Sequence, residues 1–163
     1  MSTNTAAKKV RDFDGNRSSE TGIVRAMTDA MTSDDVESMV NLFASDNGEW
    51  LIVATGERFH GLDEIRQLAT RSVAGRDHPA GTGIKPTNVF TNEEGTKLCW
   101  EYVHTGVVTD KWPASKNRPA PGTKIEMPIV LICDIRKDKL VKIREYFNLQ
   151  TVTEPGTPHK LYS

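Results

Sequence analysis

The pattern of hydrophobic and polar residues in the second half of the chain predicts a β-sheet. Two β-rich runs, 124–136 and 139–152, meet at a short charged turn, which is the pattern of an antiparallel hairpin. The run 97–108 predicts the strand before them. Leu98, Trp100, Tyr102 and His104 share one face of that strand, and their bulk assigns this face to the interior. Shorter runs predict strands at 50–54 and 84–90.

Hydrophobic residues at helical spacing predict three helices, at 19–31, 34–43 and 62–74. Ser18 or Ser19 is the expected N-cap of the first helix and Ser33 that of the second. The segment 56–61 is expected to form a turn and 75–83 a loop, because both are rich in glycine or proline. The order of elements predicts an α+β fold in which three N-terminal helices pack on one concave face of a strongly bent, mostly antiparallel mixed sheet.

The length of 163 residues suits one domain with one hydrophobic core. Residues 1–17 show no periodicity and are expected to form a disordered or loosely docked arm. The folded domain is expected over 18–154, followed by a tail at 155–163.

Composition narrows the classes of partner. Lys and Arg number 21 against 22 Asp and Glu, so the chain has no overall field that would attract nucleic acid or an anionic membrane. No apolar run is long enough to span a bilayer, and the first residues lack the hydrophobic segment of a secretory signal, so a cytoplasmic location is expected. Cys99 and Cys133 fall in strand-like runs and are expected to be free thiols in or near the core.

Candidate chemistry centres on acid–base groups. His104 ranks first, because it shares the predicted inner face with Tyr102 and imidazole titrates near neutral pH; the alternative is a histidine at the core edge that serves structure alone. Tyr102 is a candidate donor to a carbonyl or enolate oxygen, or a packing aromatic. No His, Cys or carboxylate pair has a metal-ligand spacing and no phosphate-binding loop is present, so neither a metal nor another cofactor is expected.

Several segments together resemble one family. The two front helices, Trp50 at the start of the first strand, Phe59-His60-Gly61 before Asp63-Glu64-Ile65-Arg66, and Gly122-Thr123-Lys124 before the final hairpin are similar to the NTF2-like superfamily, in particular to its SnoaL-like and limonene-epoxide-hydrolase-like branches. The resemblance covers roughly 18–152. It implies a cone-shaped fold with a deep apolar pocket, often a homodimer, and activities that include cyclases, isomerases, dehydratases and epoxide hydrolases, as well as binding modules without catalysis.

The resemblance also implies site residues. Many members read Tyr-Phe-Asp in the last strand, where this chain reads Tyr146-Phe147-Asn148, so Asn148 and Tyr146 are expected to face the pocket. Glu145 lies on the opposite face in an unbroken strand and remains a rival general base; a bulge would change this assignment. Four aromatic side chains are expected to form the pocket wall or the core: Trp50, Phe59, Trp100 and Trp112. Trp112 is also a candidate lid residue.

The expected function is therefore cofactor-independent acid–base chemistry, such as isomerisation, cyclisation or dehydration, on a small hydrophobic polyketide- or terpenoid-like molecule. A non-catalytic module that binds a small molecule or a protein is one alternative, and an epoxide hydrolase with a non-standard site is another. The outer face of 97–108 carries Cys99, Val103 and Val107 among polar residues, a surface suited to a twofold partner, so a homodimer is expected.

Overall fold

Seven strands form one curled sheet in the computed structural model, which describes residues 19–112 and 119–148. The strand order is β2-β1-β7-β6-β5-β3, and β4 also pairs with β5. The strands are β1 (Glu49–Ile52), β2 (Glu57–His60), β3 (Arg76–Asp77), β4 (Gly83–Thr91), β5 (Lys97–Val108), β6 (Lys124–Arg136) and β7 (Lys139–Phe147). Only the β1–β7 pair is parallel among the described strand pairs. The mixed, mostly antiparallel sheet is thus confirmed.

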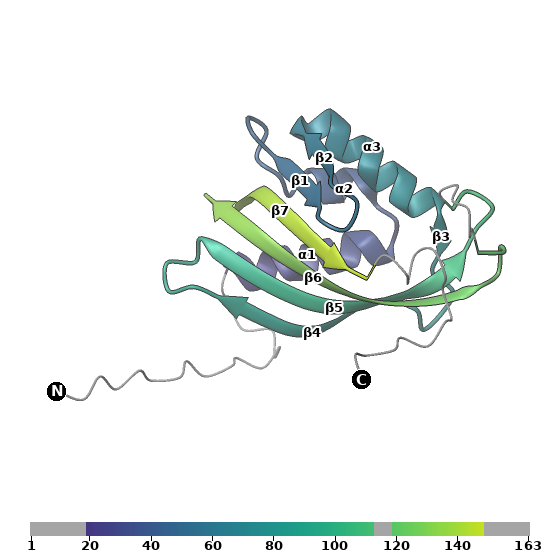
Figure 1. The fold of residues 1–163 in the computed structure, drawn as a ribbon. Coiled ribbons are helices and arrows are strands. Elements are labelled where there is room, and N and C mark those ends of the chain that lie inside the picture. The colour runs from purple at the N-terminus through teal and green to yellow at the C-terminus, as the bar shows by residue number, and fades with distance from the viewer. Residues whose placement is uncertain (1–18, 113–118, 149–163) are drawn as a thin grey trace.

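Three helices cover the concave side of this sheet (Figure 1). They are α1 (Ser19–Thr32), α2 (Val36–Val40) and α3 (Gly61–Ala74). Helix α2 contacts both α1 and α3, and α1 also contacts β4. The expected helices at 19–31 and 62–74 agree with α1 and α3 to within a residue. Among the described helices, none is long and apolar enough to cross a membrane.

The second helix is shorter than the predicted range 34–43. Asp34 has a positive φ of 58°, a left-handed conformation that separates α1 from α2. The N-cap is Asp35, whose carboxylate accepts a hydrogen bond from the Ser38 backbone amide at 3.0 Å, so the expected cap at Ser33 is wrong. The Ser33 hydroxyl instead donates to the Asp29 carbonyl at 2.7 Å.

Two predicted connections contain short strands. The expected turn at 56–61 holds β2, which pairs antiparallel with β1, and the expected loop at 75–83 holds β3, which pairs with the end of β5. Both were missed because runs of two to four residues beside glycines carry too little alternation to indicate a strand. The predicted strand 139–152 is described as β7 to Phe147; residues 149–152 lie outside the described residues, as do the expected arm at 1–17 and tail at 155–163.

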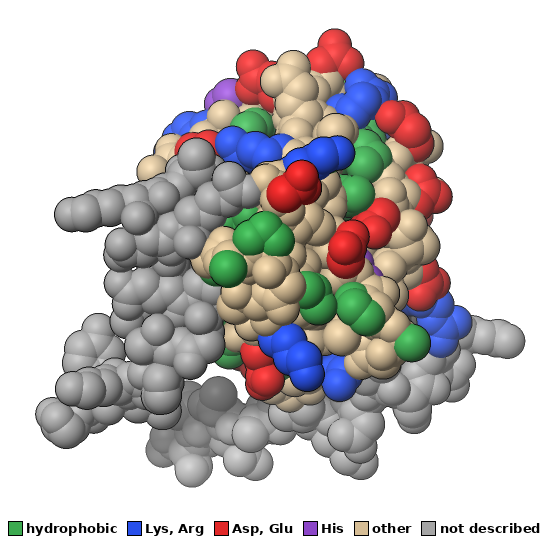
Figure 2. All heavy atoms as spheres, turned by 90° about the vertical axis from the view of Figure 1, so that its right-hand side faces the viewer, with side chains coloured by type: hydrophobic (Ala, Val, Ile, Leu, Met, Phe, Trp, Pro, Cys, Tyr) green, Lys and Arg blue, Asp and Glu red, His purple; other side chains and the backbone are tan. Residues whose placement is uncertain are grey.

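The hydrophobic core lies between the sheet and the helices. Alternate residues of β5 are buried, namely Leu98, Trp100, Tyr102, His104, Gly106 and Val108, so the predicted inner face of this strand is confirmed. Cys133 is buried beside them, whereas Cys99 is partly exposed on the other face; both are free thiols. The end of the molecule shown in Figure 2 has acidic and basic side chains interspersed, so that face carries no continuous field of one sign.

A β-bulge in β7 sets which side chains of that strand face the core. Asp134 of β6 pairs with Lys142, whereas the next residue, Ile135, pairs with Leu140, so Val141 is an extra residue in β7. Leu140 and Ile143 are consequently both buried, although three positions apart they would point to opposite faces of a regular strand. The residues beyond the bulge are therefore turned by one position relative to an unbroken alternation.

Candidate active site

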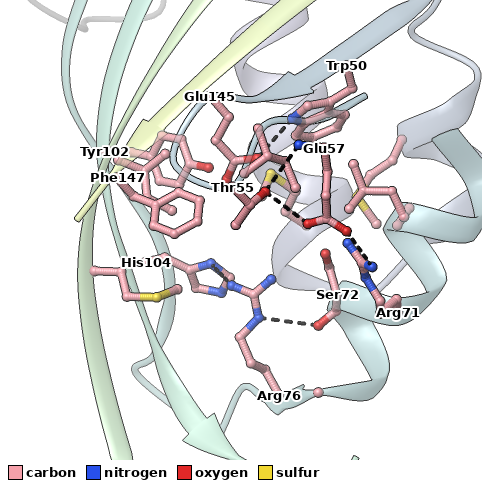
Figure 3. Close-up of a pocket in the computed structure, with 18 of the residues that line it drawn as sticks. Trp50, Thr55, Glu57, Arg71, Ser72, Arg76, Tyr102, His104, Glu145 and Phe147 are labelled. Carbon is pink, nitrogen blue, oxygen red and sulfur yellow. Dashed lines mark hydrogen bonds and ion pairs between the residues drawn. The ribbon is translucent and has the colours of Figure 1, made fainter. Parts of the chain in front are cut away.

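An internal cavity of about 270 Å³ opens between the sheet and the helices. Its volume is close to the lower end of the range typical of small-molecule sites. Most of its wall is apolar and comes from α1, α2, α3 and the inner face of the sheet, with contributions from Met31, Met39, Ile52, Leu68, Met127 and Ile129. Its polar side chains are Thr55, Glu57, Arg71, Ser72, Arg76, Tyr102, His104 and Glu145, of which the last four come from β3, β5 and β7 (Figure 3).

Glu145 reaches the cavity because of the bulge in β7. It pairs with Ile52 of β1, and the Trp50 indole nitrogen donates a hydrogen bond to its Oε2 at 2.8 Å. The ring of Trp50 is fixed in turn by stacking on Phe43, with ring centroids 5.8 Å apart. Burial raises the pKa of the Glu145 carboxyl, an effect opposed by the Trp50 hydrogen bond and by the charge of Arg76. A carboxyl of this kind exchanges protons more readily near neutral pH than a surface glutamate does.

Tyr102 belongs to β5 and lies opposite Glu145, which belongs to β7. The Tyr102 hydroxyl points toward Glu145 (Figure 3). Its ring packs on Trp100 with centroids 4.5 Å apart, and the residue is 1% exposed. The hydroxyl is buried and has no hydrogen-bond partner among the described residues. Burial raises the pKa of Tyr102 well above its usual value, so the phenol stays protonated and is available as a donor.

His104 takes part in a line of hydrogen bonds that begins at Arg76. Arg76 Nη1 lies 2.7 Å from His104 Nδ1, and His104 Nε2 lies 2.7 Å from Nε2 of His78. A guanidinium only donates, so His104 Nδ1 accepts a hydrogen bond from Arg76. The proton of His104 is then on Nε2, which donates a hydrogen bond to Nε2 of His78. His78 Nδ1 then faces Asp34 Oδ1 at 3.2 Å. This assignment satisfies both ring nitrogens of His104 with both imidazoles neutral.

The electrostatics agree with neutral imidazoles. Burial, together with the charge of Arg76 and the neighbouring His78, lowers the pKa of His104 to about 2. Burial also lowers the pKa of His78, against the opposing effect of Asp34. His104 lines the cavity as expected from the sequence, but both of its ring nitrogens are engaged. The arrangement therefore favours His104 as a residue that holds Arg76, and Glu145 as the proton-transfer group.

The expected inward orientation of Asn148 and Tyr146 is wrong. Tyr146 is 39% exposed and Asn148 is also exposed, while Glu145 and Phe147 line the cavity. The bulge at Val141 is the physical cause, because it reverses which residues of the later half of β7 face inward.

The remaining predicted aromatic residues divide between the cavity and the core. Trp50 and Trp112 line the cavity. Trp100 is buried behind Tyr102 and is not part of the cavity wall. Phe59 is partly buried against the core, with the Arg71 guanidinium 5.4 Å from its ring centroid. Phe59 thus supports the cavity only indirectly, through Arg71, which lines the cavity.

The sequence reasoning missed the cluster of Asp34, Arg76 and His78. Arg76 and His78 lie in the short strand β3 and just after it, in a segment expected to be a loop, and Asp34 lies in the turn before α2. Only spatial proximity reveals this group. Among the described residues, no three His, Cys, Asp or Glu side chains are placed to hold a metal ion.

Comparison with known proteins assigns the fold. Residues 24–143 match the family model described as a SnoaL-like domain. No curated protein sequence matches this chain.

Solved structures show the same fold. A protein from Xanthomonas campestris named as a polyketide cyclase shares 22% identity, with a TM-score of 0.67, 83% of this chain covered and 94% of the other. A protein from Catenulispora acidiphila with a ketosteroid isomerase-like fold, solved with trimethylamine, also shares 22% identity, with a TM-score of 0.63 and coverages of 80% and 88%. The epoxide hydrolase/cyclase-like enzyme SalBIII, studied in pyran ring formation in the polyether salinomycin, shares 15% identity, with a TM-score of 0.62 and coverages of 80% and 92%. At these identities the likeness establishes the fold.

Proposed function

Because this chain belongs to the SnoaL-like domain family, we propose that it is an enzyme that moves a proton on a small hydrophobic carbonyl compound, with Glu145 as the group that carries the proton. The observation that carries this proposal is the position of a partly buried carboxyl with a raised pKa in the wall of an apolar cavity, opposite a phenol that has no hydrogen-bond partner among the described residues. Perturbed carboxyls in such cavities are typical of catalytic sites. The structural relative named as a polyketide cyclase and the one with a ketosteroid isomerase-like fold support an enzyme of this class.

The reaction begins with removal of a proton from the carbon beside the carbonyl group. Glu145 Oε2 is occupied by the Trp50 indole, whereas Oε1 makes no hydrogen bond with the described residues and is the oxygen that accepts the proton. The electron pair of the broken C–H bond moves onto the carbonyl oxygen and forms an enolate. The Tyr102 hydroxyl stabilises that oxygen by donating a hydrogen bond, as donors in an oxyanion hole do.

The fate of the enolate decides the reaction type. Return of the proton from Glu145 to another carbon gives isomerisation. Attack of the enolate carbon on a second carbonyl carbon of the same molecule gives cyclisation, and the alkoxide that forms takes the proton from Glu145. Loss of a β-hydroxyl that takes the proton from Glu145 and leaves as water gives dehydration. Each outcome returns Glu145 to its starting state and uses only side chains of this chain.

Proton transfer can be tested before the natural substrate is known. Small cyclic ketones and β-dicarbonyl compounds are incubated with the protein in D₂O, and exchange of the α-hydrogens is followed by NMR. We expect the native protein to accelerate exchange for the compounds that bind, and Glu145→Gln to reduce the acceleration by about 100-fold or more, in the range usual for general acid–base groups.

Glu126→Gln is the matched control, because Glu126 is exposed on the other face of β6, and it should retain full exchange. Undiminished exchange by folded Glu145→Gln would contradict the proposal. Ligands that bind to the native protein without any exchange would favour the binding module over the enzyme.

A further inference from the structure

Arg76 is a partly buried cation in the cavity wall that forms no ion pair with a carboxylate of the described residues. The described residues place no Asp or Glu oxygen within ion-pair distance of its guanidinium, although they provide eight ion pairs between Lys or Arg and a carboxylate elsewhere. Burial lowers the pKa of Arg76, and Glu145 opposes this effect only through space. Charged groups in protein interiors are normally paired, because removal of a charge from water is costly. Among the described residues, the Arg76 guanidinium therefore lacks the carboxylate partner that a purely structural arginine would be expected to have.

The contacts of Arg76 leave part of its donor fork open. Nε donates to the Ser72 carbonyl at 3.2 Å and Nη1 donates to His104 Nδ1. Nη2 makes no hydrogen bond with the described residues, and Arg76 lines the cavity (Figure 3). A guanidinium has five N–H groups in a fixed plane, which suits two parallel hydrogen bonds to a carboxylate.

The surroundings hold this fork in place. His104 is oriented by His78, which in turn faces Asp34. Gly106 permits this packing, because a Cβ atom there would lie 2.8 Å from the Asp77 carbonyl oxygen and 3.3 Å from the His78 ring. These side chains thus hold the Arg76 guanidinium against His104. Because His104 is neutral, it does not cancel the positive charge of Arg76.

We propose that Arg76 binds the carboxylate of a small hydrophobic acid, whose apolar body lies against the methionine, leucine and isoleucine side chains of the cavity. This inference rests on the cavity used by the proposed function and specifies its substrate class, but it requires no proton transfer.

Matched acids and amides test the proposal, because they differ in charge but hardly in size. The probes are cinnamate and 4-phenylbutanoate against cinnamamide and 4-phenylbutanamide, measured by calorimetric titration. The native protein should bind each acid at least about tenfold more tightly than its amide. Arg76→Met should remove this preference, whereas Arg144→Gln, on the outer face of β7 beside Asp134, should keep it.

A second measurement does not depend on the folding of Arg76→Met. Nitrogen-15 NMR of arginine side chains in the native protein should show a shift of the Arg76 signal on addition of cinnamate and none on addition of cinnamamide. Glu145→Gln should keep the preference for acids even though it loses hydrogen exchange, so the two proposals fail separately. Equal binding of acid and amide by the native protein, or a preference that survives in folded Arg76→Met, would overturn the assignment.

Discussion

Removal of the Tyr102 hydroxyl is expected to stabilise the protein. In Tyr102→Phe the ring keeps its stacking on Trp100, while a buried hydroxyl without a partner among the described residues is lost. An unsatisfied buried polar group costs about 1–3 kcal/mol, so the free energy of unfolding should rise by roughly that amount. For a chain of this length, each kcal/mol corresponds to about 2–4 °C in the unfolding midpoint.

Tyr146→Phe is the matched control for this measurement. It makes the same chemical change on the same sheet, but Tyr146 is 39% exposed and its environment is solvated. Its effect should stay within about 0.5 kcal/mol, as is usual for surface substitutions. Both variants are compared with the native protein by urea unfolding, without ligand. A Tyr102→Phe variant that is less stable than the native protein would refute the reasoning, because the hydroxyl would then make a favourable hydrogen bond in the free protein.

Three further predictions follow from the structure, two on stability and one on oligomeric state. Glu145→Gln should be more stable than the native protein at neutral pH. The pKa of the native carboxyl lies above its ordinary 4.5, so the protonated carboxyl contributes stability below pH 4.5, and this stability is lost as pH rises through the raised pKa. The loss is about 1.4 kcal/mol per unit by which the pKa is raised. Equal stabilities from pH 4 to 8 would contradict this. Gly106→Ala should destabilise by about 1–3 kcal/mol through overpacking against Asp77, whereas Gly22→Ala, with open space at its Cβ, should stabilise α1 slightly; unfolding curves decide. We also propose a homodimer formed through the outer face of β5, and a monomer mass in light scattering at micromolar concentration would exclude it.

The strong alternation of β5 made the inner wall of the site predictable from sequence. Tyr102 and His104 share a face with Leu98 and Trp100 over an uninterrupted strand, so a period of two was enough to place them inside. Both residues line the cavity. Their roles were harder to anticipate, because the neutral state of His104 depends on Arg76 and His78, which are 28 and 26 residues away.

The last strand shows where such reasoning fails. The family resemblance placed Tyr146 and Asn148 inside, and an unbroken alternation counted from Leu140 agrees, yet one extra residue, Val141, exchanges the two faces and brings in Glu145. No residue of this segment is a glycine or proline that would indicate the bulge. A register shift of one residue is enough to turn Tyr146 and Asn148 outward and to bring Glu145 and Phe147 to the cavity.

A titration of the Glu145 side chain tests most directly whether burial makes this residue a proton carrier at the cavity wall. Carbon-13 NMR of protein labelled in the glutamate carboxyl groups identifies the Glu145 signal by its loss in Glu145→Gln. The midpoint of this signal in the folded protein should lie above the midpoint of glutamate in the urea-unfolded protein. A midpoint at or below the unfolded value would contradict the account, because the carboxyl would then be stabilised as an anion rather than poised for proton transfer.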